Sequence, residues 1–396
     1  MKRREFVKQT SLVSSLLLVP RFIQAFDDLV TSASGYRRLV VIQLSGGNDG
    51  LNTIVPYRND IYYSSRPNLA LRSNNLIALN DELALHNSLT PFMRLYEKGY
   101  VSILNNVGYP NPDRSHFRSM DIWHTASHSH EYLQTGWIGR YLDANGEKPY
   151  NAIELNEKLS LALKGQVRNG MATNNAQLLY RTAQDPYFKT LIKHQLDDHL
   201  GEHNLGYLYR TLISAESSAK YIYEKSKTKR SNEEYSKGSF GRQMKSAAQF
   251  INSGLKTRVF YVAQNGYDTH ANQKQTQARL LGNFAVNLEK FVIDLKKAGT
   301  FEDTLIMVFS EFGRRVKQNA AQGTDHGAAN SVFILGENLK KPGIFNEPSN
   351  LTDLDTNGDI KYEIDFRAIY SSILRDWMRA DVESVISGDF PPITLV

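Results

Sequence analysis

Residues 38–44 read Arg-Leu-Val-Val-Ile-Gln-Leu, and they run directly into Ser-Gly-Gly-Asn-Asp-Gly at 45–50. A nearly continuous apolar run of this length is typical of a strand that is buried on both faces of a parallel sheet. The glycines and polar residues that follow predict a tight loop at the carboxyl end of that strand. This stretch therefore favours an α/β fold.

Four further apolar runs predict strands of the same kind, at 100–107, 258–263, 304–309 and 331–335. Between two of them, residues 273–297 have apolar side chains at helical spacing, and Ala298-Gly299 is a helix stop. Strands that alternate with helices predict an α/β domain with a mostly parallel sheet. From about 159 to 253 the sequence is helical and polar. We therefore expect one α/β domain over 36–396 with a helical insertion.

The first 25 residues have the pattern of a secretory leader. They contain a basic start with Arg3-Arg4, a short apolar stretch at 12–19, and Ala25 at a plausible cleavage point. The stretch is too short to span a bilayer, which needs about 20 apolar residues. The paired arginines resemble a twin-arginine leader, and the alternative is a basic amphipathic helix. We expect a twin-arginine signal peptide over 1–25, export by that machinery to the periplasm or beyond, and no membrane span after its removal.

Charge and cysteine content narrow the function classes. The chain has 47 Lys+Arg and 41 Asp+Glu, a net charge of +6. Five basic residues and one acidic residue in 1–25 account for +4 of it, which leaves +2 for the mature chain. Little net charge then remains to drive binding of nucleic acid. Because the chain has no cysteine, disulfides, thiol nucleophiles and thiolate metal sites are excluded.

Carboxylates and histidines follow the predicted strands at their carboxyl ends, where ligands collect in open parallel sheets. They are Asp49 after the first strand, Asp268 and His270 after the third, Glu311 after the fourth, and Asp325 and His326 shortly beyond. We expect such side chains to converge in space, where they suit borderline metals such as zinc or manganese. Taken singly, Asp49 can be a turn or cap residue, and Asp325-His326 can be a turn. The combined pattern favours a metal site.

A hydroxyl group lies where a nucleophile is expected. Ser115 falls at a predicted helix start after the second strand, where backbone N–H groups and the helix dipole favour an alkoxide beside a metal. The alternative role is a simple helix cap, and the sequence leaves both open. Arg114 and Arg314 can balance charge on a transferring group by bidentate contact, or they can form structural salt bridges.

Two other sequence patterns, a calcium-loop-like turn and a basic stretch, are explained by ordinary local structure. The stretch Asp355-Thr-Asn-Gly-Asp359 resembles the start of a calcium loop, but its glycine is fourth and its twelfth residue is Phe366. A polar turn is therefore favoured. Residues 217–245 carry eight basic and three acidic side chains. They can attract an anionic partner, but a solvated helical face is favoured.

Six stretches resemble a known family across nearly the whole mature chain: 39–57, 114–127, 135–143, 257–273, 310–336 and 365–378. This family is the bacterial domain of unknown function 1501, whose members commonly carry twin-arginine leaders and are similar to the alkaline phosphatase and sulfatase superfamily. The resemblance implies an alkaline-phosphatase-like three-layer sandwich, with a mostly parallel sheet and helices on both faces. It also implies metal ligands at strand ends and a nucleophile at a helix start.

Carried over by position, the resemblance places Ser115 at the nucleophile position. The implied metal ligands are Asp49, Asp268, His270, Glu311 and His326, with Asp325 beside His326 as a further ligand or as a group that orients it. The implied cofactor is one or two divalent ions of zinc, manganese, calcium or magnesium. The sulfatase nucleophile motif is absent, and Glu311-Phe312 stands where superfamily members have Asp-His. The chain therefore has one imidazole fewer.

These observations lead to two functional hypotheses. The first is an exported metal-dependent hydrolase or transferase that acts on anionic phosphate or sulfate esters, with Arg114 or Arg314 balancing charge. The second is a cell-envelope binding or scaffold protein that keeps the fold without turnover, and Phe312 favours it. A metal site requires that the predicted ligands meet within roughly 5 Å of a common point.

Overall fold

The centre of the fold is a large mixed sheet. Its middle strand β1 (Arg38–Ser45) pairs in parallel with β8 (Val259–Asn265) on one side and with β9 (Thr304–Phe309) on the other. Within the described residues the sheet has nine strands, in the order β11-β5-β10-β9-β1-β8-β6-β7, with β12 paired to β5. The remaining strands are β5 (Val101–Gly108), β6 (Ala152–Glu154), β7 (Met171–Ala172), β10 (Asn330–Leu335), β11 (Gly343–Ile344) and β12 (Ile364–Asp365).

This computed structural model describes residues 36–193, 204–231 and 233–396. The predicted leader at 1–25 lies outside the described residues. Every element named here belongs to a unit that spans Arg37–Val396. In the described part of the chain, no helix is both long and apolar enough to cross a membrane.

All five predicted strands are present, and the sheet is mostly parallel. The exception is β10, which runs antiparallel to both β9 and β5. Because β10 runs in the opposite direction to β9, the loop that enters β10 lies at the same edge of the sheet as the carboxyl ends of β1, β8 and β9.

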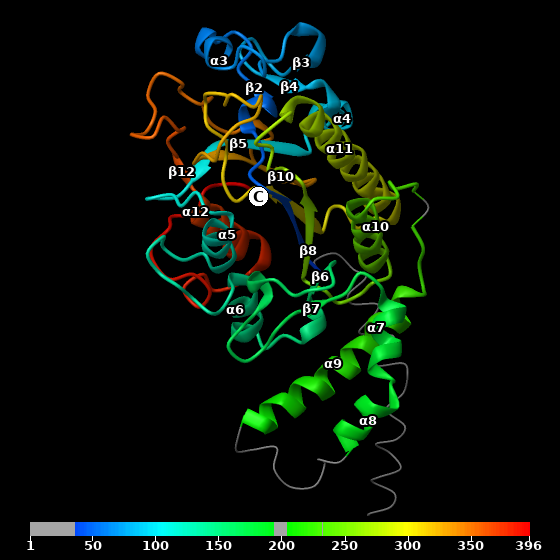
Figure 1. Cartoon of the computed structure of the whole chain (residues 1–396). Helices are drawn as coiled ribbons and strands as arrows, with labels where there is room; N and C mark the ends of the chain where they lie inside the picture. Colours follow the sequence, from blue (N-terminus) through cyan, green and yellow to red (C-terminus); the bar gives the residue numbers. More distant parts are fainter. Residues whose placement is uncertain (1–35, 194–203, 232) are drawn as a thin grey trace, which may run out of the picture. The chain divides into compact units, whose positions relative to one another are not determined.

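Helices cover both faces of the sheet (Figure 1). Along β1, Val40 and Ile42 belong to one buried apolar cluster, whereas Leu39 and Val41 belong to another on the opposite face. The first cluster is covered by α4 (Thr90–Glu97), α10 (Ser239–Asn252) and α11 (Gln273–Ala298), and the second by α5 (His116–Thr125), α6 (Trp137–Ala144) and α12 (Phe366–Ser372). This alternation follows from the two-residue period of a strand. The predicted three-layer α/β fold is confirmed.

A second, small sheet follows β1 in the chain. It consists of β2 (Ile54–Val55), β3 (Leu76–Ala78) and β4 (Ala84–His86), with α3 (Asp60–Ser65) between β2 and β3. Short 3-10 helices occur at Gly50–Asn52, Ser73–Asn75, Asn87–Leu89, Pro149–Asn151 and Leu161–Leu163, and a π-helical turn covers Ile373–Met378.

The segment predicted as a helical insertion, 159–253, contains α7 (Ala176–Ala183), α8 (Pro186–Lys193), α9 (Asn204–Ser226) and α10. Tyr180 of α7 and Tyr223 of α9 stack with their ring centroids 4.4 Å apart. The segment also contributes β7 to the main sheet and α10 to the main core. Its two ends are thus part of the α/β fold, and its middle is helical.

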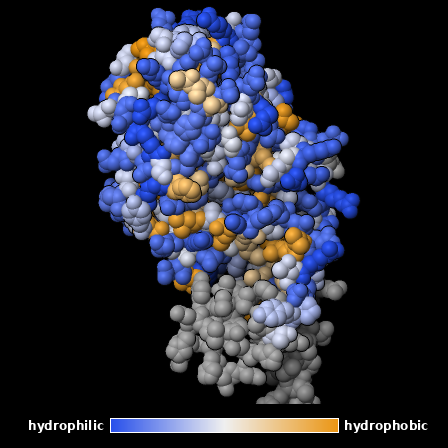
Figure 2. All heavy atoms as spheres, viewed as in Figure 1, coloured by the Kyte–Doolittle hydropathy of each residue, from blue (hydrophilic) through white to orange (hydrophobic). Residues whose placement is uncertain are grey.

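The face seen in Figure 2 is mostly hydrophilic, with small scattered apolar groups.

Candidate metal centre

Three loops and one helix meet at the carboxyl edge of the central strands. The loop after β1 approaches the loop after β8 so closely that a Cβ on Gly46 would lie 2.4 Å from the backbone nitrogen of Asp268. Gly46 also has a φ of +117°, a conformation that side chains disfavour. This glycine therefore allows the close approach that places Asp268 above β1.

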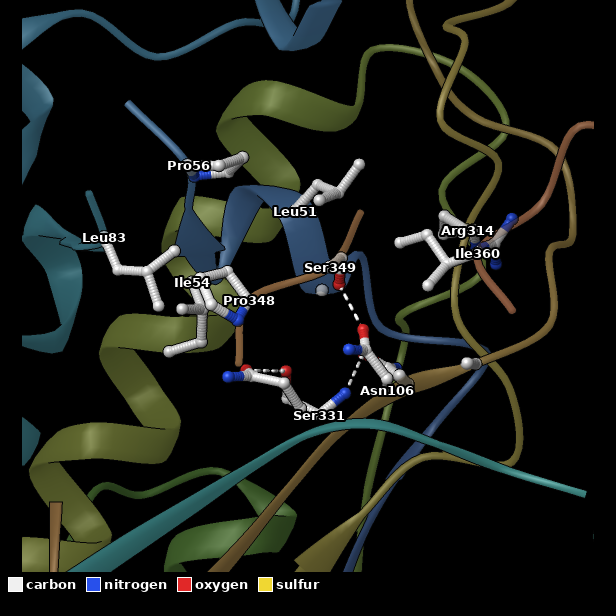
Figure 3. Close-up of a pocket in the computed structure, with 14 residues that line it drawn as sticks. Leu51, Ile54, Pro56, Leu83, Asn106, Arg314, Ser331, Pro348, Ser349 and Ile360 are labelled. Atoms are coloured by element: carbon white, nitrogen blue, oxygen red, sulfur yellow. Dashed lines mark hydrogen bonds between the residues drawn. The ribbon is translucent and has the colours of Figure 1, made fainter. Parts of the chain in front are cut away.

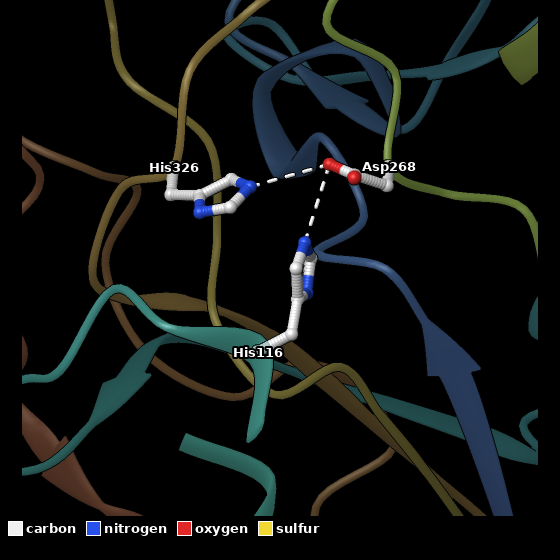
Figure 4. Close-up of side chains that lie close together, drawn as sticks. All are labelled: His116, Asp268 and His326. Carbon is white, nitrogen blue, oxygen red and sulfur yellow. Dashed lines mark hydrogen bonds and ion pairs between the residues drawn. The ribbon is translucent and has the colours of Figure 1, made fainter. Parts of the chain in front are cut away.

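Three imidazole nitrogens surround one carboxylate oxygen at this edge. Asp268 Oδ1 lies 3.0 Å from Nε2 of His270, 3.2 Å from Nε2 of His116 and 3.2 Å from Nε2 of His326. Ligand atoms of His116, Asp268 and His326 all lie within 4.8 Å of one another, and Figure 4 shows both rings turned toward the carboxylate. In addition, Nε2 of His270 is 2.9 Å from Nε2 of His326. Three of the predicted ligands, Asp268, His270 and His326, thus lie together, and His116 joins them.

The other ring nitrogen of each histidine is held by an oxygen. The contacts to Nδ1 are Glu311 Oε1 for His116 at 2.9 Å, the Arg114 carbonyl for His326 at 2.6 Å, and Asp325 Oδ1 for His270 at 3.3 Å. Carbonyl and ionised carboxylate oxygens only accept hydrogen bonds, so each Nδ1 carries a proton and donates it to its oxygen. Nε2 is then the ring nitrogen that can bind a cation, which is the usual arrangement in metal-binding histidines.

The donor atoms fit a divalent cation. The Nε2 atoms of His270 and His326 lie 2.9 Å apart, so both face the same point beside Asp268, where a cation could bind them. His116 Nε2 is buried and makes no hydrogen bond within the described residues. Three imidazoles and one carboxylate suit zinc or another borderline metal, whereas calcium and magnesium prefer oxygen ligands.

Charges around the cluster shift the pKa values of its members. Burial acts to raise the pKa of Asp268, but hydrogen bonds from Arg314 and His326 outweigh it and hold the pKa well below its usual range. The hydrogen bond to Glu311 raises the pKa of His116, whereas burial lowers the pKa of His326. Asp268 is therefore ionised at neutral pH, and His116 keeps its second proton to a higher pH than His326.

Zinc affinity is expected to increase as the pH rises past the pKa of His116, which is raised. The reason is that zinc and a proton compete for Nε2 of this ring. The same proton stabilises the metal-free protein below the unfolded pKa of about 6.5, and this contribution disappears as the pH rises through the higher folded pKa. Zinc titration against a chromophoric chelator between about pH 5.5 and 8.5 checks this. Glu311→Gln is expected to move the rise to lower pH, and a flat profile in both proteins contradicts the prediction.

Asp49, predicted as a ligand, lies in a different contact network. Its side chain is 1% exposed, and Oδ2 is 2.6 Å from Nη1 of Arg66, which is 0% exposed. Gln273 also donates a hydrogen bond to Oδ2. The structure thus pairs Oδ2 of Asp49 with a buried guanidinium, and among the described residues the group of donor atoms within 4.8 Å of one another consists of His116, Asp268 and His326.

Glu311 and Asp325 contact the imidazoles from outside the cluster. Glu311 is buried, and its Oε1 accepts both the His116 contact and the backbone N–H of Gly46 at 2.8 Å. Asp325, expected beside His326, contacts His270 instead. Both carboxylates thus orient a histidine ring in the structure.

The two arginines predicted to balance charge on a transferring group both bind carboxylates of the protein. Arg314 is buried, and its guanidinium donates to Asp268 Oδ1 at 2.8 Å and to backbone carbonyls of the neighbouring loops. The Arg114 guanidinium binds Asp355 and Asp359. In the structure both arginines make the salt bridges that the sequence left open as the alternative.

Ser115 is the residue that precedes α5. It is exposed, and its side chain makes no capping hydrogen bond to the helix. Its backbone N–H donates to Asp113 Oδ1 at 2.7 Å. The hydroxyl is thus not used as a helix cap, and it belongs to the residue directly before His116.

His116 is the site residue that sequence reasoning missed. It stands in the same Arg-Ser-His stretch that suggested Ser115, and the only signal was a histidine at a helix start next to a strand end. Phe312 packs against this part of the cluster, with its ring centroid 4.8 Å from that of His116 and 4.7 Å from that of His326. This position thus carries an aromatic ring and no imidazole, as the sequence indicated.

Two cavities lie near the cluster. One of about 300 Å³ is lined mainly by apolar side chains and shares Glu311 and Phe312 with the site. The other, of about 20 Å³, lies between the loops around Leu51, Asn106 and Ser349 (Figure 3). That second volume suits about one water molecule, so it is too small for a substrate.

Fold and cluster together define a class: an α/β protein with a histidine-rich, metal-type donor site at the carboxyl edge of its sheet. The model of the family described as "Protein of unknown function (DUF1501)" matches residues 36–386, and the chain belongs to this family. No curated protein matches the chain in sequence.

Several solved structures are similar to the chain. A phosphonate monoester hydrolase from Silicibacter pomeroyi has 10% identity and a TM-score of 0.42, with 87% of this chain and 74% of that chain covered. A sulfatase from Pseudoalteromonas sp. has 10% identity and a TM-score of 0.39, covering 94% and 73%. A protein of the alkaline phosphatase superfamily from Vibrio parahaemolyticus has 12% identity and a TM-score of 0.36, covering 90% and 68%. At these TM-scores none of them assigns an activity to this chain.

Proposed function

We propose that this protein is a divalent-metal-dependent hydrolase or transferase of phosphate or sulfate esters. The observation that carries the proposal is the convergence of three imidazole Nε2 atoms on Asp268 Oδ1, at 3.0 to 3.2 Å. The position of the cluster supports it as well, because open α/β sheets bind their ligands at this edge.

The residues of the chain have distinct roles in this proposal. A divalent cation held by His116, His270, His326 and Asp268 supplies a Lewis acid for the ester. Glu311 holds the Nδ1 proton of His116, so the ring binds the cation as a neutral ligand with a fixed orientation. Asp268 is 48% exposed, which leaves the cluster open to an ester from solvent.

Ser115 or a water molecule is the nucleophile. The Ser115 hydroxyl precedes a helix of ten residues, and the positive end of the helix dipole stabilises negative charge on its oxygen. An attack in line with the ester bond transfers the phosphoryl or sulfuryl group to that oxygen and releases the alcohol. Transfer to water or to a second alcohol then gives a hydrolase or a transferase.

Turnover of aryl phosphate and aryl sulfate esters by zinc-loaded and chelator-treated protein tests the proposal. We expect activity only with the metal. Ser115→Ala is expected to lower turnover by about 10²-fold or more if serine is the nucleophile, with zinc affinity unchanged. Ser73→Ala, at another exposed serine, serves as the control. An unchanged rate for Ser115→Ala assigns the attack to water.

A binding or scaffold protein is the second candidate, and the packing of Phe312 against His116 and His326 favours it. An aromatic ring there takes the place of a donor that a second cation would need. If the purified protein binds zinc but turns over no ester of either class, and Ser115→Ala changes nothing in cells, the enzyme proposal fails and this candidate stands.

A further inference from the structure

The polar turn at Asp355–Asp359 binds the residue that precedes Ser115. Arg114 Nε donates to Asp359 Oδ2 at 2.7 Å, and its Nη2 donates to Asp359 Oδ2 and to Asp355 Oδ2, the latter at 3.1 Å. The Asp359 side chain is 0% exposed. A planar guanidinium held by two carboxylates has a fixed orientation, so the turn fixes the position of Arg114.

The turn itself is closed by its own side chain. Asp355 Oδ1 accepts the backbone N–H groups of Asn357 and Asp359, at 2.8 and 2.9 Å. This pattern is an Asx-type turn, and it leaves the other carboxylate oxygen, Oδ2, facing Arg114. The turn therefore presents two carboxylates from one rigid segment.

The backbone of Arg114 reaches the histidine cluster. Its carbonyl oxygen accepts the Nδ1–H of His326 at 2.6 Å. One residue thus joins the two features, with its side chain on the turn and its carbonyl on a ring of the cluster. The turn has a second contact to the same loop, because the Ile360 carbonyl accepts the N–H of Ala329 at 3.3 Å.

We propose that the Asp355–Asp359 turn is a positioning device for the metal centre. Asp359 acts through Arg114, whose carbonyl accepts the Nδ1–H of His326 and so keeps Nε2 of that ring directed at Asp268. Arg114 and Asp359 are positioning residues in this account, and the Arg114 guanidinium does not contact the substrate. The inference rests on the proposed metal centre, but the tautomer of His326 can be measured without a metal.

The test is Asp359→Asn, which removes the charge that holds Arg114. The matched control is Asp353→Asn, in the same segment, where the carboxylate is 65% exposed and pairs with Lys361 instead. We expect Asp359→Asn to weaken zinc binding by about 3- to 10-fold, because it acts through Arg114, whereas loss of a group bonded directly to a metal-binding histidine costs about 10- to 100-fold. The control is expected to bind zinc like the original protein, and chelator competition gives both affinities.

A second readout separates positioning from general destabilisation. Long-range proton–nitrogen NMR of the metal-free protein reports the tautomer of His326, and we expect Nδ1–H in the original protein and a mixture of tautomers in Asp359→Asn. If Asp359→Asn does not fold, Asp355→Asn removes only the 3.1 Å contact and is expected to show a smaller loss in the same direction. Arg114→Lys is expected to keep the charge but lose the fixed geometry, and so to resemble Asp359→Asn.

Two results overturn the inference: unchanged zinc affinity in Asp359→Asn, or an unchanged His326 tautomer in that variant. If the original protein binds no zinc, the proposed function fails, and the tautomer measurement still decides the role of the turn.

Discussion

Asp268→Asn is expected to abolish tight zinc binding and to lower ester turnover by on the order of 10³-fold or more, because the metal supplies several kcal/mol of transition-state stabilisation. Asp268 Oδ1 is the atom on which the three Nε2 atoms converge. An amide keeps the shape of the side chain but removes the negative charge that offsets the cation. Zinc affinity by chelator competition and turnover at saturating zinc measure the two effects.

Asp325→Asn is a milder variant, and its zinc affinity is compared with that of Asp268→Asn. Asp325 contacts only His270 among the cluster residues, at 3.3 Å, so its loss is expected to weaken zinc binding by about 10-fold. Arg314 keeps its hydrogen bonds to backbone carbonyls when Asp268 is replaced, so both variants should fold. Wild-type zinc affinity in folded Asp268→Asn contradicts the proposed centre.

Arg66→Met is expected to lower the free energy of unfolding by about 3 to 5 kcal/mol, because it leaves the Asp49 charge buried and unpaired. Both side chains are at most 1% exposed, and their atoms are 2.6 Å apart. Arg66 Nε also donates to the Val316 carbonyl at 2.8 Å, so that backbone group loses its partner as well. Urea unfolding followed by circular dichroism gives the difference.

The double variant Asp49→Asn with Arg66→Met separates the charge from the packing. Removing both charges is expected to restore part of the lost stability, since no unpaired ion remains. Zinc affinity of Asp49→Asn alone is expected to match that of the original protein. If Asp49→Asn loses zinc binding while Arg66→Met is only mildly destabilised, Asp49 is a ligand, as the resemblance implied, and the buried pair is not its main role.

The central strands could be read from the sequence because each is a short apolar run bounded by turn residues. The direction of β10 could not, since an apolar run looks the same in either direction. That direction matters, because it brings the loop with His326 to the edge where Asp268 and His270 lie. The prediction of a helical insertion over 159–253 did not foresee that β7 joins the main sheet and that α10 joins the main core. Tertiary packing decides which sheet or core an element belongs to, and a single sequence does not show it.

The site was predicted in part. Asp268, His270 and His326 were expected from their positions after strands, and they lie in the cluster. His116 was missed because the same stretch suggested a serine nucleophile. The contacts of Asp49 could not be foreseen, since its partner Arg66 lies in a separate, irregular stretch and nothing local marks the pair. Local sequence thus indicated which strand ends carry the cluster residues, whereas tertiary contacts decide which side chains face the centre of the cluster.

X-ray absorption at the zinc edge of the purified, zinc-loaded protein tests the central claim most directly. The proposed centre predicts one zinc ion with three imidazole nitrogens and carboxylate oxygen at about 2.0 to 2.2 Å, and Asp268→Asn should lose this signature. A spectrum without imidazole scattering, or a protein that retains no zinc at neutral pH, would contradict the account.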